Sequence, residues 1–161
     1  MTKAPCPVLA IPQKCKFKIP EKITFASDYH KKDIQSIKFL LKWNDPFGAK
    51  INILHIDDGE LMPVAEEELF KKYKAKIKKQ CEDISLSFQH VEGKDISKAI
   101  LRTTLNDKTD ILSLSPIKRE GIWSRFFHKS ITKTTAFHIH IPVLTIPVSY
   151  THLTLPTKRI V

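Results

Sequence analysis

The chain has 161 residues, of which 42% are hydrophobic and 27% are charged, and its formal net charge is +10. These values are typical of a globular domain with a sizeable core. No stretch approaches the roughly 20 apolar residues that a membrane helix needs, and the N-terminus lacks the layout of a signal peptide. The cysteines Cys6, Cys15 and Cys81 include no CxxC pair, which argues against a disulfide framework. These features predict a cytoplasmic protein with no membrane partner.

The positive charge is spread along the chain. The densest basic run, residues 71–79, lies in a predicted helix and places lysines on several faces. No aromatic platform or recognition-helix pattern accompanies this run. A solvated basic helix is therefore the preferred interpretation, and a nucleic-acid-associated module is kept as a further alternative.

Buried strands and helices alternate along the chain. Short apolar runs predict fully buried strands, and the spacing of Ile34, Ile37 and Leu41 predicts a helix. Asp95 is the expected N-cap of a later helix. The predicted order is strand 23–26, helix 31–43, strand 50–56, helix 62–82, strand 85–91, a helix after Asp95, strand 111–114, and then a loop, a helix and a last strand.

This alternation predicts an α/β fold, in which helices cover both faces of a parallel sheet. Ligands of such folds bind beyond the carboxyl ends of the strands, where the strand order reverses. The residues predicted at those ends are Ser27, Asp28, residues 55–57 and residues 115–116. Any small-molecule site is expected there.

Two heptapeptides near opposite ends of the chain are near copies. CPVLAIP (residues 6–12) and IPVLTIP (residues 141–147) agree at five of seven positions, with an offset of 135 residues. A repeat one domain-length apart indicates a duplicated domain. We therefore expect residues 1–18 to be the last strand and linker of a preceding domain, and residues 19–147 to be the main domain. Residues 148–161 fit no element and are expected to be a non-native tail, with a native disordered tail as the alternative.

Several strings, in this order, resemble the universal stress protein family. ITFASDYH (residues 23–30) resembles its first strand and turn, and INILHIDDG (residues 51–59) resembles its second strand. VEGKDISKAI (residues 91–100) resembles the start of its third helix, and HIHIPVLTIP (residues 138–147) resembles its fifth strand. The resemblance implies a three-layer α/β/α fold of the adenine nucleotide alpha hydrolase-like type. Its five-stranded parallel sheet would have the order 3-2-1-4-5.

Members of this family form dimers, or tandem domains that mimic a dimer, through their fifth strands. The resemblance therefore implies a homodimer or a tandem-domain pseudo-dimer, and pairing would also cover an exposed sheet edge. We expect the two copies of the repeat to pair antiparallel. One strand would contain Pro7, Val8, Leu9, Ala10 and Ile11, and the other Val143, Leu144, Thr145 and Ile146.

Many family members bind ATP through the pattern Gly-x2-Gly-x9-Gly-Ser/Thr after the fourth strand. Glycines there let backbone N–H groups approach the phosphates. In this chain all three glycines are replaced, so the preferred prediction is that no cofactor is required, with ATP binding as the alternative. The positions that the resemblance implies for a nucleotide are Ala26, Asp28, Ile56, Ser115, Lys118, Arg119, Lys129, Ser130 and Thr132.

No catalytic residue is predicted, because no triad or paired catalytic carboxylate has supporting context. No metal site is expected either, since His138 and His140 offer only two ligands. The preferred prediction is a non-enzymatic stress-response protein of the universal stress class. It would act through dimerisation and through an unidentified protein partner. The alternative is an adenine-nucleotide-binding switch of the same fold.

Overall fold

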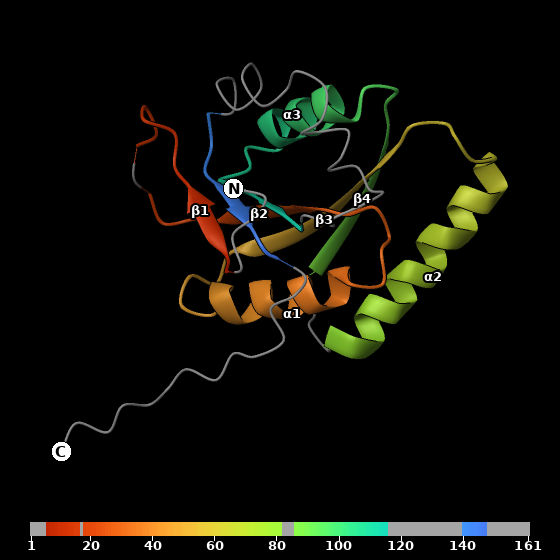
Figure 1. Ribbon diagram of the computed structural model, residues 1–161, viewed down its shortest axis with the longest axis horizontal. Helices are drawn as coiled ribbons and strands as arrows, with labels where there is room; N and C mark the ends of the chain where they lie inside the picture. Colours follow the sequence, from red (N-terminus) through yellow and green to blue (C-terminus); the bar gives the residue numbers. More distant parts are fainter. Residues whose placement is uncertain (1–5, 17, 82–85, 116–139, 148–161) are drawn as a thin grey trace.

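A computed structural model describes residues 6–16, 18–81, 86–115 and 140–147, and it places one six-stranded sheet between two helical layers (Figure 1). The strand order is β1-β6-β5-β2-β3-β4, and only the β1–β6 pair is antiparallel within the described sheet. The elements in chain order are β1 Val8–Ala10, β2 Lys22–Ala26, α1 Asp33–Asn44, β3 Lys50–Asp57, α2 Pro63–Cys81, β4 Leu86–Glu92, α3 Ile96–Asn106, β5 Ile111–Leu114 and β6 Val143–Thr145.

The predicted fold class is confirmed. The five parallel strands run β4-β3-β2-β5-β6, which is the expected order 3-2-1-4-5 with β1 added at the β6 edge. The central strands β2, β3 and β5 are largely buried because helices cover both faces of the sheet. All four residues of β5 are buried, for example, and this strand has its predicted bounds.

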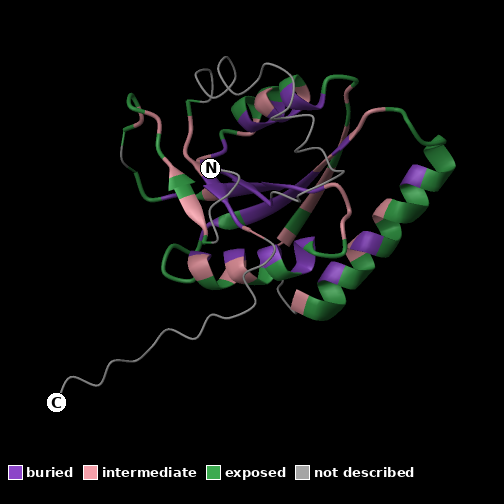
Figure 2. Ribbon diagram, viewed as in Figure 1, coloured by how far each residue is buried: buried purple, intermediate pink, exposed green. Residues whose placement is uncertain are grey.

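The core is divided into two parts by the sheet. On one face, α1 and α2 contribute Ile37, Leu40 and Ile77 to a cluster around Phe25. On the other face, residues of α3 pack against Leu54, Ile56, Leu112 and Leu114. Buried residues lie in the sheet and on the helix faces turned toward it, and the outer side of α2 is exposed (Figure 2). Among the described helices, none combines the length and apolar character that crossing a membrane requires.

The ends of the helices are set by local chemistry. Asp95 caps α3 as predicted, because its carboxylate accepts a hydrogen bond from Lys98 N at 3.1 Å. Helix α1 ends at Asn44, whose side chain bonds both the N–H and the C=O of Ala49. These two bonds close the turn into β3, in which Gly48 has a φ of +64°.

The two copies of the repeat form adjacent strands. Val8 is paired with Thr145, Leu9 with Leu144, and Ala10 with residue 143, in the expected antiparallel direction. Thr145 Oγ1 also donates a hydrogen bond to the carbonyl of Val8 at 3.2 Å. β1 therefore covers the edge that β6 would otherwise expose. That β1 derives from a preceding domain stays a prediction.

Basic residues of α2 are partly neutralised within the helix itself. Lys71 pairs with Glu67 and Lys72 with Glu68, each at 2.6 Å and one helical turn apart. All four side chains are largely exposed, so these pairs contribute little to stability. They are what a solvated helix face is expected to contain.

Candidate functional site at the carboxyl end of the sheet

The structure describes only some of the residues that were predicted to bind a nucleotide. Ala26, Ile56 and Ser115 are buried at the carboxyl ends of β2, β3 and β5, and Asp28 is half-buried in the turn after β2. These ends are adjacent because β2 pairs in parallel with both β3 and β5. The remaining predicted residues lie outside the described part of the chain, namely Lys118, Arg119, Lys129, Ser130 and Thr132.

Ser115 occupies the first glycine position of the phosphate-loop pattern. Its side chain is buried, and its Oγ lies 2.9 Å from Oγ of Ser36 on α1. Ser36 is also buried, so this hydroxyl pair joins the end of β5 to the helix. The serine that replaces glycine therefore has a role in the packing of this fold.

A buried polar network lies under the turn after β2. Ser27 Oγ is 2.5 Å from Asp33 Oδ2 and 2.8 Å from the hydroxyl of Tyr73, which also donates to Asp33 at 3.2 Å. Burial raises the pKa of Asp33 to about 7, although the hydrogen bond from Ser27 opposes this shift. The network fixes the start of α1 beside the candidate site.

Tyr29 has an unusual backbone conformation in the same turn. Its φ is +61°, which is rare for a bulky residue and is concentrated at functional sites. Its ring stacks on that of His55, with centroids 3.7 Å apart and planes 16° apart. The hydroxyl is buried and has no hydrogen-bond partner among the described residues. Burial raises the pKa of Tyr29, and the carboxylates of Glu66 and Asp57 raise it further.

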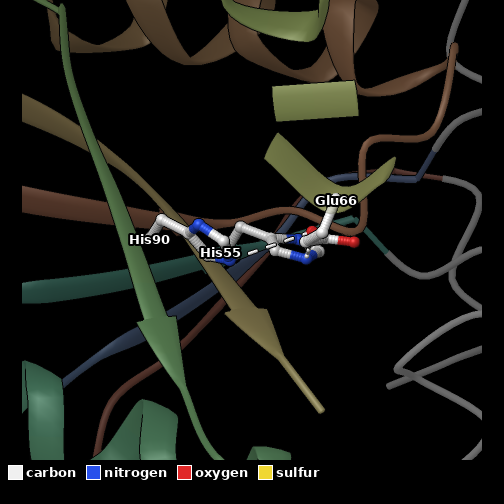
Figure 3. A group of neighbouring side chains, drawn as sticks. All are labelled: His55, Glu66 and His90. Atoms are coloured by element: carbon white, nitrogen blue, oxygen red, sulfur yellow. Dashed lines mark ion pairs between the residues drawn. The ribbon is translucent and has the colours of Figure 1, made fainter. Parts of the chain in front are cut away.

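Two histidines and a glutamate converge beside Tyr29, and we call them the His55–Glu66–His90 cluster (Figure 3). His55 on β3 and His90 on β4 are register partners, and Glu66 comes from the first turn of α2. Glu66 Oε1 lies 2.9 Å from His55 Nε2 and 3.9 Å from His90 Nε2. Glu66 is buried, whereas His90 is open to solvent.

His55 is held by both ring nitrogens. Its Nδ1 lies 2.9 Å from the carbonyl oxygen of Ser27. A carbonyl oxygen can only accept, so Nδ1 carries a hydrogen, and Nε2 of the neutral ring has a lone pair. Burial lowers the pKa of His55, and its contacts with Ser27 and Glu66 oppose that shift. The chemistry of the cluster therefore depends on whether a proton or another cation lies between His55 Nε2 and Glu66 Oε1.

The sequence analysis did not find this cluster. It expected no metal site and considered His138 and His140, of which His140 is exposed and residue 138 is not described. A usable signal was present, because His55 and His90 lie near the carboxyl ends of neighbouring predicted strands. The register that places them opposite one another is visible only in the structure.

Comparisons with known proteins identify the fold. No protein-family model and no curated protein sequence matches the chain. A universal stress protein solved in complex with cAMP is similar over 82% of this chain and 100% of its own, at 14% identity and a TM-score of 0.59. The chain has the universal stress protein fold. The shared architecture includes the parallel sheet and the helical layers described above.

Two longer structures are also similar. A universal stress protein from Archaeoglobus fulgidus matches 88% of this chain at 13% identity, with a TM-score of 0.60. A putative universal stress protein from Pseudomonas aeruginosa matches 91% at 16% identity, with a TM-score of 0.59. This chain spans only 49% and 54% of their lengths. At these identities the universal stress likeness concerns the fold alone.

Proposed function

We propose that this chain is a universal stress protein domain that acts without catalysis, by pairing at the β6 edge and binding a protein partner. The observation that carries the proposal is the β1–β6 ladder. Its strands come from near-identical heptapeptides 135 residues apart. In a pair of such domains, each domain would offer the same strand to the other, as a two-fold contact requires.

A tandem arrangement explains why the matching strand precedes the domain. In it, β1 would be the last strand of a first domain, and residues 19–147 would be the second. The lengths of the two longer relatives support this reading, since this chain spans about half of each. The proposed unit is therefore a pseudo-dimer within one longer polypeptide.

Removing residues 1–12 is expected to make the chain self-associate. Without β1, the backbone groups of β6 on its outer side lose their partners, and a second copy can supply them. Sedimentation velocity over a range of concentrations should show a monomer–dimer equilibrium that the full chain lacks. A peptide of residues 7–12, added in excess, should return the truncated chain to monomer.

A truncated chain that remains monomeric at high concentration would contradict this edge-pairing role. A dimer that the peptide does not dissociate would place the contact elsewhere on the molecule. Circular dichroism of both chains checks that the truncation leaves the parallel sheet folded.

A second function, a nucleotide-binding switch, is favoured by one observation: a similar structure was solved with cAMP. Asp28 and the ends of β2, β3 and β5 lie where such a fold would bind a ligand. The buried Ser115–Ser36 pair argues against the glycine-dependent mode of phosphate binding, because a hydroxyl now fills the first position. We therefore propose that no nucleotide is required.

Isothermal titration with ATP·Mg²⁺ and with cAMP is expected to give no saturable heat. Saturable binding that Asp28→Ala abolishes would establish the switch instead. Asp45→Ala is the matched control, because Asp45 is an exposed aspartate at the far end of α1. It should leave any nucleotide binding unchanged.

A further inference from the structure

We propose that the His55–Glu66–His90 cluster binds a divalent transition metal ion, with Zn²⁺ as the best match. The three potential ligand atoms come from β3, α2 and β4 and lie within 4.8 Å of one another (Figure 3). Two imidazoles and one carboxylate, with a fourth position left for water, make a ligand set that zinc sites use. Mg²⁺ and Ca²⁺ prefer oxygen ligands alone, so the histidines favour a transition metal.

The orientation of His55 supports a metal more strongly than the distances alone. Metal-binding histidines commonly donate their second ring N–H to a backbone carbonyl, and His55 Nδ1 lies 2.9 Å from the carbonyl of Ser27. Nε2 then carries a lone pair, and Glu66 Oε1 lies only 2.9 Å from it. Two electron-rich atoms at this distance repel each other unless a positive charge lies between them. A bound cation supplies that charge.

The carboxylate of Glu66 also lacks a group among the described residues that would compensate its buried negative charge. Its Oε1 is buried and accepts no hydrogen bond from a described donor. The ion-pair partners of Glu66 among the described residues are the two histidines, not a lysine or an arginine. Burying a carboxylate without compensation is costly, and coordination of a metal is one of the ways in which proteins avoid that cost.

The spacing suits a small cation after minor adjustment. Tetrahedral ligands at 2.0–2.2 Å from zinc are about 3.3 Å from one another. The distances from Glu66 Oε1 to the two Nε2 atoms, 2.9 and 3.9 Å, lie on either side of that value. The side chain of His90 is partly exposed, whereas the ring of His55 is stacked on that of Tyr29. Asp57 Oδ2, 3.7 Å from His90 Nε2, adds negative charge beside the site.

The test is titration of the metal-free full chain with Zn²⁺, in competition with a chromophoric chelator. The chain should bind one Zn²⁺ at this site. His90→Gln and Glu66→Gln should each weaken that site by more than about 100-fold, because loss of an outer partner alone costs 10–100-fold. The matched control is His140→Gln, which removes an exposed histidine outside the cluster and should leave the affinity unchanged.

X-ray absorption of the zinc-loaded chain provides an independent readout, with nitrogen and oxygen neighbours expected at about 2.0–2.1 Å. If Glu66→Gln fails to fold, His90→Gln alone tests the proposal. The side chain of His90 is partly exposed, so its replacement should not prevent folding. The proposal is overturned if the wild-type chain binds no zinc. It is also overturned if His90→Gln binds zinc as tightly as the wild-type chain, since the zinc would then lie elsewhere. The short distance between His55 and Glu66 would in that case be explained by a proton shared between them.

Discussion

Replacing Asp33 with asparagine is expected to stabilise the fold at pH 8 by about 4 kcal/mol. Asp33 is buried at the start of α1, and this burial raises its pKa from 3.8 to about 7. In the unfolded chain the carboxyl loses its proton near pH 3.8, but in the folded chain it keeps the proton until about pH 7. Folding stability therefore falls as the pH rises through this window. Asparagine, which has no proton to lose, avoids this penalty.

The measurement is urea denaturation of both chains from pH 4 to pH 8. The difference in the free energy of unfolding should be smallest near pH 4, where the folded carboxyl is protonated and the unfolded one is only partly ionised, and it should grow until about pH 7. Asp45→Asn, on an exposed aspartate at the other end of α1, is the matched control for the loss of a carboxylate. A difference for Asp33→Asn that stays constant from pH 4 to pH 8 would contradict the raised pKa of the folded carboxyl.

Gly93→Ala is expected to lower the free energy of unfolding by about 1–3 kcal/mol. A Cβ at position 93 would lie 2.7 Å from the Cβ of Ala99 and 3.5 Å from a methyl group of Ile56. Real Cβ atoms do not approach so closely, so α3 would have to move away from the sheet. The glycine also donates its N–H to the carbonyl of Asp57 at 2.8 Å, which holds the turn after β4 close to β3.

A double-mutant cycle separates this clash from other effects of the substitution. Ala99→Gly alone should lower the free energy of unfolding by about 1 kcal/mol, because glycine is less favourable than alanine within a helix. In the Gly93→Ala background the same change removes the opposing methyl group, so the double variant should be more stable than the sum of the two single effects predicts. Additive effects in thermal or urea denaturation would contradict the proposed contact.

Much of the fold follows from the sequence because the central strands β2, β3 and β5 are largely buried on both faces. The run Ile111–Leu114 is apolar enough to be placed at its observed bounds, and Asp95 has the position and chemistry of an N-cap. Helix α1 is less well placed: it begins at Asp33 and not at residue 31. Tyr29 turns the chain through a left-handed conformation just before it, and no sequence rule favours a bulky residue there.

The candidate metal site is harder to predict, because its residues are far apart in the chain. Alternation along a strand indicates which face His55 and His90 occupy, but not that they are opposite one another in register. Glu66 contacts the histidines because the first turn of α2 packs beside His55 of β3. The burial of Asp33 depends likewise on Tyr73 from a distant helix. These features come from tertiary packing, which local patterns do not encode.

The β1–β6 ladder also has a consequence for how the chain acquires its structure. β1 has only three residues and must find a partner about 135 positions away, so we expect it to dock after the parallel strands have assembled. Until then, β6 offers the same edge to any neighbouring chain. In concentrated refolding mixtures, β1 of one molecule can complete the sheet of another, and domain-swapped dimers would form. Dilute refolding should favour the closed monomer.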